Sequence, residues 1–137
     1  MVMNEYKELF SQYFMVKSED VLGYSESTLN KNLLNSSIKL TYQAVFYSVC
    51  ALAMMHSFKT SCHFQMMGWF NKKFVHEEKV FDKKLSKIYG DVFMLKQKSE
   101  YEPKYPADAS RAKELLADAM VFIETVRTVI NDEQLSK

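Results

Sequence analysis

Hydrophobic residues recur at intervals of three and four along nearly the whole chain, and no stretch alternates convincingly at a period of two. Spacings of three and four place side chains on one face of an α-helix, whereas alternation is typical of a strand. The pattern therefore predicts an all-α fold, an up-and-down helical bundle of four long helices plus one short helix, in a single domain over 1–137. The predicted helices cover about 4–28, 38–55, 64–74, 76–101 and a last segment that starts near 106–108.

Two of these helices have a distinct apolar pattern. The segment from Ile38 to Met55 is apolar on most sides, so we expect it to be the most buried helix. Its longest nearly apolar run, Val45–Met55, is too short to span a bilayer, and we expect no membrane segment. In the first helix one ridge of 3–4 spacing is formed by Phe10, Phe14, Lys17, Val21, Tyr24 and Thr28.

Polar residues and prolines predict the helix ends. Thr60 or Ser61 is expected to cap the third helix. The fourth is expected to open at His76–Glu78, because acidic residues are favoured in a first turn. Pro103 and Pro106 are expected to end it, with Pro106 tolerated in the first turn of the last helix.

Composition narrows the picture further. Only three Gly and two Pro leave little room for the tight turns of a sandwich or barrel. Aromatic residues (8 Tyr, 10 Phe and 1 Trp) and nine Met exceed what the core of such a bundle needs. We therefore expect a homodimer, with part of the segment Met66–Phe70 at its interface, where aromatic residues and Met are enriched.

The formal net charge is only +1, which does not indicate a strongly basic nucleic-acid binder. Residues 59–104 nevertheless contain ten Lys against six acidic residues, which fits either a phosphate-bearing partner or a solvated helix face. Because no secretory segment follows the N-terminus, we expect a cytoplasmic protein with Cys50 and Cys62 reduced. The three histidines and Cys62 lack the spacing of a zinc site, and no glycine-rich phosphate loop is present, so no metal or cofactor is expected.

The end of the fourth predicted helix carries the most informative polar residues. Lys96 and Glu100 are four residues apart, so they share a helix face and can form an ion pair. Tyr101 follows at the helix exit. The sequence shows no activated nucleophile and no carboxylate pair on an apolar face, so no catalytic residue is assigned.

Four segments, in this order and at matching distances, resemble motifs of the HEPN domain, the higher-eukaryote and prokaryote nucleotide-binding domain. The resemblance runs from about residue 18 to about residue 130. The segments are 42–52, with its Tyr and Phe; His63 followed by Phe70 and Phe74–Val75; 87–101, which ends in Glu-Tyr; and 112–130.

The resemblance implies an all-α bundle, often a homodimer, whose relatives often neighbour a minimal nucleotidyltransferase as paired toxin and antitoxin. Some members are metal-independent ribonucleases with an Arg four to six residues before a His. In some pairs the nucleotidyltransferase adenylylates a tyrosine just after that motif. The family name proposes nucleotide binding.

The chain departs from this pattern at the catalytic positions. Lys96 stands at the family's Arg position and Glu100 at its Asp position, while Lys39 or Leu40 replaces the Arg expected before the Tyr motif. No His follows His76. Lysine keeps the positive charge but lacks the planar fork that binds phosphate through two hydrogen bonds.

Two functions remain open from the sequence. The first is a non-catalytic module that binds a nucleotide, RNA or a partner nucleotidyltransferase, in a toxin–antitoxin context, through Lys59, Lys96, Lys98 and Tyr101, with His63 and Glu100 nearby. The alternative is a divergent metal-independent ribonuclease toxin in which Lys96 and His63 replace the usual pair.

Overall fold

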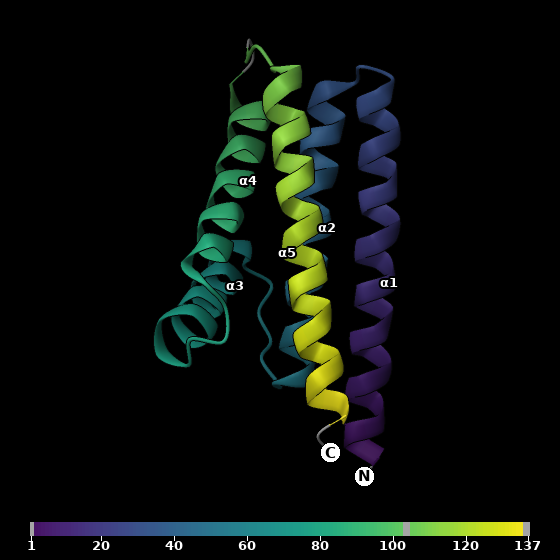
Figure 1. Ribbon diagram of the computed structural model, residues 1–137, viewed down its shortest axis with the longest axis vertical. Helices are drawn as coiled ribbons and strands as arrows, with labels where there is room; N and C mark the ends of the chain where they lie inside the picture. The colour runs from purple at the N-terminus through teal and green to yellow at the C-terminus, as the bar shows by residue number, and fades with distance from the viewer. Residues whose placement is uncertain (1, 103–104, 136–137) are drawn as a thin grey trace.

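The computed structural model describes residues 2–102 and 105–135, which form helices and no strand (Figure 1). The predicted all-α bundle of four long helices and one short helix is confirmed. The start of α1 and the end of α5 lie at the same end of the bundle (Figure 1). The elements are α1 (Val2–Asn30), α2 (Leu34–Met55), α3 (His63–Phe70), the π-helix η1 (Asn71–Glu77), α4 (Lys83–Tyr101) and α5 (Ala109–Leu135).

Helix α2 is the centre of the bundle, as predicted, and contacts α1, α3, α4 and α5. Twelve of its 22 residues are buried. By length and composition it is also the one helix in the described part of the chain that could cross a membrane, although 67% of its most apolar window is buried. The bundle therefore covers most of the surface that a bilayer would otherwise cover.

The ridge predicted in the first helix is not the face that α1 buries. Phe10 and Tyr24, two members of that ridge, are 47% and 61% exposed. The buried face instead carries small and medium side chains at spacings of four and three, namely Ser11, Met15, Ser18, Val21 and Ser25. The prediction was wrong because it placed large apolar residues at a contact that serine makes.

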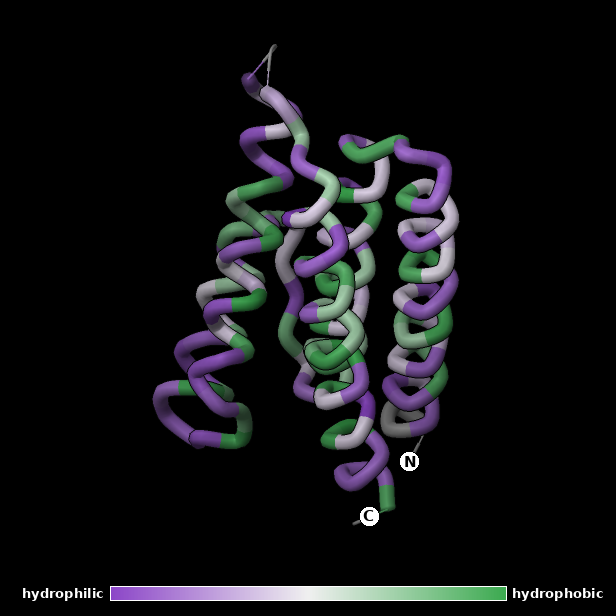
Figure 2. Tube along the Cα trace, turned by 45° about the horizontal axis from the view of Figure 1, so that its top comes forward, coloured by the Kyte–Doolittle hydropathy of each residue, from purple (hydrophilic) through white to green (hydrophobic). Residues whose placement is uncertain are grey.

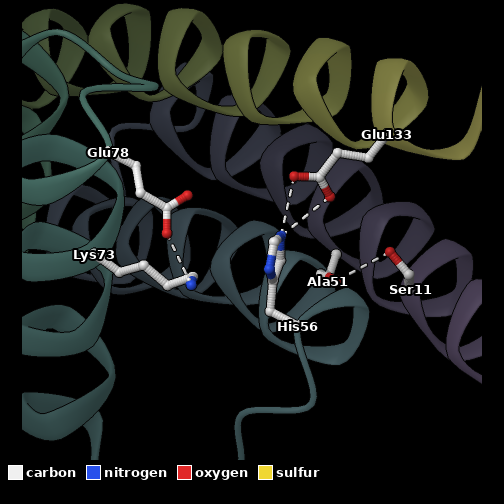
Figure 3. Close-up of polar contacts among 6 residues, drawn as sticks. All are labelled: Ser11, Ala51, His56, Lys73, Glu78 and Glu133. Carbon is white, nitrogen blue, oxygen red and sulfur yellow. Dashed lines mark hydrogen bonds and ion pairs between the residues drawn. The ribbon is translucent and has the colours of Figure 1, made fainter. Parts of the chain in front are cut away.

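Three serines of α1 hydrogen-bond to the backbone of α2. They are seven residues apart, and so are their partners, so the contact repeats every two helical turns of an antiparallel pair. Each hydroxyl donates to a main-chain carbonyl oxygen: Ser11 to Ala51 at 2.9 Å, Ser18 to Ala44 at 2.6 Å and Ser25 to Ser37 at 2.9 Å (Figure 3 shows the first). Side chains this small allow the two helix backbones to approach closely.

The third and fourth helices begin elsewhere than predicted. Cys62 is the N-cap of α3, while the Thr60 hydroxyl accepts a hydrogen bond from the Cys62 amide at 3.1 Å. Residues 76–78 do not open α4, because η1 continues α3 through Glu77 and buries Phe74 and Val75. Burying these side chains is worth more than the small charge–dipole gain that the acidic residues would have at a helix start.

Aspartates cap both of the last two helices. Asp82 caps α4 by accepting a hydrogen bond from the Lys84 amide at 2.8 Å, and Asp108 accepts one from the Ser110 amide at 3.0 Å before α5. Helix α4 ends at Tyr101 as predicted, while Pro103 lies outside the described residues. Pro106 precedes α5 and is not in its first turn.

The segment Met66–Phe70, expected in part at a dimer interface, packs largely inside the protomer. Met66 and Phe70 are buried, and Met67 and Trp69 pack against the core. The Phe70 ring centroid lies 5.3 to 5.6 Å from three other aromatic rings, those of Phe81, Tyr89 and Phe122. Much of the aromatic surplus is therefore core, and exposed hydrophobic residues recur instead along α1 (Figure 2).

Val49→Asp is expected to unfold the domain. Val49 is fully buried in α2, and an unpaired buried charge costs several kcal/mol against a total stability of about 5–15 kcal/mol. Far-UV circular dichroism should show loss of most helical signal at 25 °C. A variant with wild-type helicity and melting temperature would contradict the placement of α2.

Ser18→Leu tests the close contact between α1 and α2. Ser18 is fully buried, so three extra carbons must be overpacked and should destabilise the fold by about 1–3 kcal/mol. Ser27→Leu, on the exposed side of the same helix, is the matched control and should change the free energy of unfolding by less than about 0.5 kcal/mol. Equal stability of the two variants in urea unfolding would refute the contact.

Candidate ligand-binding site

The site lies where α2, α3 and α4 meet, and its centre is a tyrosine–histidine pair. Tyr42 of α2 is buried, and a hydrogen bond of 2.8 Å joins its hydroxyl to Nδ1 of His63, the first residue of α3. The His63 ring stacks on Phe46 with 3.9 Å between ring centroids and 10° between planes. Two residues of α2 thus fix the position and the orientation of the imidazole.

A carboxylate flanked by two lysines lies beside this pair. Lys96 Nζ is 3.1 Å from Glu100 Oε2, the ion pair that their spacing predicts, and 5.3 Å from the Tyr42 ring centroid. Lys39 Nζ, from α2, approaches the other oxygen of Glu100 at 3.8 Å. The Lys96 side chain is only 19% exposed, whereas Lys39 is largely in solvent. With two lysines and one carboxylate, the cluster carries a net charge of +1.

Burial is the main cause that lowers the pKa of His63 below its usual value, and the positive charge of Lys96 lowers it further, while Glu100 acts in the opposite direction. The imidazole is therefore neutral at pH 7. Burial also raises the pKa of Tyr42, which keeps its proton. Since the Tyr42 hydroxyl has no other acceptor among the described residues, it donates to Nδ1 of His63. The ring proton of His63 is then on Nε2, and no described group accepts it.

Exposed aromatic surface adjoins the charged cluster. Phe64 follows His63 in α3 and is 66% exposed. Its ring centroid is 6.2 Å from that of Phe93 of α4, which is 5.8 Å from the Tyr42 ring. An exposed ring next to lysines is a surface on which a planar group can stack. Sequence analysis missed Phe64 and treated it as core, and its position directly after His63 is the signal that could have identified it.

The other sequence-predicted residues lie apart from this cluster. Lys98 is near Asp91 and Arg111, in a shallow hollow between α4 and α5. Tyr101 is 74% exposed at the end of α4. Lys59 lies with Lys7 at an apolar cavity of about 460 Å³ between the start of α1 and the end of α2. Of the six predicted residues, the structure brings together three: His63, Lys96 and Glu100.

The remaining polar residues do not form a metal centre. Among residues 2–102 and 105–135, no three His, Cys, Asp or Glu side chains gather closely enough to hold a metal ion. His56 instead joins the ends of α2 and α5, with Nε2 at 3.0 and 3.1 Å from the two carboxylate oxygens of Glu133 (Figure 3). Cys50 and Cys62 are both free.

The fold and the site define a small helical module with a basic, aromatic surface where α2, α3 and α4 meet. Comparison with protein families gives a match to the HEPN domain over residues 11–129, and the chain belongs to this family. The chain is also similar to a UPF0332 protein of Thermotoga maritima, at 28% identity over 130 residues, which cover 95% of this chain and 97% of that protein.

Family membership makes the two lysines more informative. Lys96 occupies the family's Arg position, and Lys39 or Leu40 the position of the Arg expected before the Tyr motif. Of that second pair, Lys39 reaches Glu100. The two substituted positions therefore meet at one carboxylate, and the site keeps positive charge from both helices.

Proton NMR titration of His63 tests the electrostatics of the site. The His63 imidazole should titrate below its usual pKa of about 6.5. Lys96→Ala removes a positive charge and should raise the pKa of His63, and Glu100→Gln removes a negative charge and should lower it. Lys98→Ala, on the same helix but facing α5, is the control and should leave the pKa unchanged. A His63 pKa unaffected by all three changes would contradict the site.

Proposed function

We propose that the cluster of Lys39, Lys96, Glu100, His63 and Phe64 binds a phosphate-bearing nucleotide unit, free or at an RNA end, without cleaving it. The observation that carries this proposal is that lysines from two helices share one carboxylate beside an exposed aromatic ring. One phosphate oxygen can take the place of a Glu100 oxygen for Lys39, whose pairing at 3.8 Å is loose. Phe64 offers its ring to a base.

The orientation of His63 favours binding over cleavage. A general base needs an unprotonated nitrogen facing the substrate, but the hydrogen bond from Tyr42 leaves the proton on Nε2. With its pKa lowered, His63 is also rarely protonated at pH 7, which makes it a weak general acid. Nε2–H can instead donate one hydrogen bond to a phosphate oxygen. Lys96 stays charged beside Glu100 and supplies a point charge without exchanging protons.

The end of α4 supports a second role, in a toxin–antitoxin pair with a nucleotidyltransferase. The Tyr101 ring is 74% exposed, so a partner enzyme could reach its hydroxyl as a nucleotidyl acceptor. This role requires only access to Tyr101. It is therefore separable from the cluster, because Tyr101→Phe would abolish modification by such a partner while nucleotide binding at Lys96 persists.

Titration with ATP and with a short single-stranded RNA tests the binding site. Lys96→Ala should weaken binding about tenfold or more, because hydrogen bonds to charged groups are worth about 1.5–3 kcal/mol. Lys98→Ala removes the same charge from the same helix and should weaken binding less than about threefold. Equal losses in the two variants would point to diffuse electrostatic attraction and contradict the site.

Incubation of the protein with total RNA distinguishes the alternative, a divergent ribonuclease. The wild type should leave RNA intact over hours. The position of His63 beside Lys96 makes cleavage the natural competitor of this proposal. Cleavage by the wild type that is lost in both His63→Ala and Lys96→Ala would establish the ribonuclease and overturn the non-catalytic function.

A further inference from the structure

Helix α1 has two contrasting faces. Ser11, Ser18 and Ser25 are fully buried against α2. On the opposite side, large apolar side chains are 54–60% exposed at spacings of three, four and three: Tyr6, Leu9, Tyr13 and Val16, here called the α1 seam. The serines recur every seven residues on the side of the helix that faces away from the seam.

The spacing of the α1 seam is that of a coiled-coil contact. Alternating steps of three and four keep one stripe of side chains facing a partner helix over several turns. No charged residue interrupts the seam, and Asp20 occupies the next position, where the apolar stripe ends. No described helix of the same chain covers it, because α1 contacts α2 and α5 on its other sides. A stripe of this regularity is not a scatter of single exposed residues.

We propose that the α1 seam is the interface of a homodimer, in which α1 pairs with α1 of a second copy in antiparallel orientation about a two-fold axis near Ser11. In this register Tyr6 lies opposite Val16 of the second copy, and Leu9 opposite its Tyr13. Every layer then joins one aromatic and one aliphatic side chain, so the surface is complementary to itself, as a two-fold interface requires. Parallel pairing would instead place Tyr on Tyr and Asp20 on Asp20.

The exposed area is enough for a specific dimer. The seam together with the neighbouring Phe10 offers five large side chains, each about half exposed, or about 100 Å² apiece. Two copies would bury about 1,000 Å² of apolar side-chain surface, the lower range of specific interfaces, before any polar rim is included. The ligand-binding cluster is built from α2, α3 and α4, so this dimer leaves it open and does not depend on the proposed function.

Light scattering on matched variants tests the interface. At tens of micromolar the wild type should have twice the chain mass of 16.1 kDa. Tyr13→Glu should give the single-chain mass with unchanged helicity, because Tyr13 is exposed and makes no buried core contact. Tyr24→Glu, an equally exposed tyrosine of the same helix outside the seam, should remain a dimer. A monomeric wild type, or a Tyr13→Glu protein that stays dimeric, would overturn the proposal.

Disulfide trapping tests the antiparallel register, in a Cys62→Ser background that removes the exposed native thiol. A mixture of Tyr6→Cys and Val16→Cys proteins should form a mixed disulfide on mild oxidation. Each variant alone should stay largely uncross-linked, since the antiparallel register keeps like positions apart. Efficient cross-linking of either variant with itself, and none in the mixture, would contradict this register.

Discussion

The close contact between α1 and α2 constrains the rest of the bundle. Serine hydroxyls of α1 donate to carbonyl oxygens of α2 that already belong to its helical hydrogen bonds. At the end of the pair near the connecting turn, the Ser25 hydroxyl also lies 2.6 Å from that of Thr41 and 3.0 Å from that of Ser37. These polar groups are buried yet satisfied, so they fix register as well as distance. A large apolar residue at any of the three serine positions would force the helices apart.

This contact determines which sides of α2 are left for the other helices. With Ser37, Thr41 and Ala44 turned toward α1, the adjacent positions Tyr42 and Phe46 turn toward α3 and α4. They hold the His63 ring and bring Tyr42 under Lys96. The same contact leaves the large residues of α1 in solvent. The ligand-binding cluster and the α1 seam are thus two consequences of one rotation of two helices.

Local periodicity was enough to predict part of this arrangement. The apolar segment 38–55 is the central helix, and the i, i+4 pair Lys96–Glu100 forms on α4. The serine face was missed, because a serine that bonds to another helix's backbone gives no hydrophobic signal. The sequence also could not place His63 beside Lys96, since 32 positions of intervening chain, including the η1 turn, separate them. The start of α4 was misplaced because burial of Phe74 and Val75 outweighed a weak charge pattern.

The most direct test of the account is the rate at which a thiol reagent labels single cysteines placed on the two faces of α1. In a Cys62→Ser background the remaining native thiol is unreactive, because burial raises the pKa of Cys50 to about 12. Ser18→Cys should label orders of magnitude more slowly than Tyr13→Cys in dilute protein. Tyr13→Cys should in turn slow as protein concentration rises and the seam is covered. Equal labelling of the two positions would show that α1 is rotated from its place here, and would contradict the account.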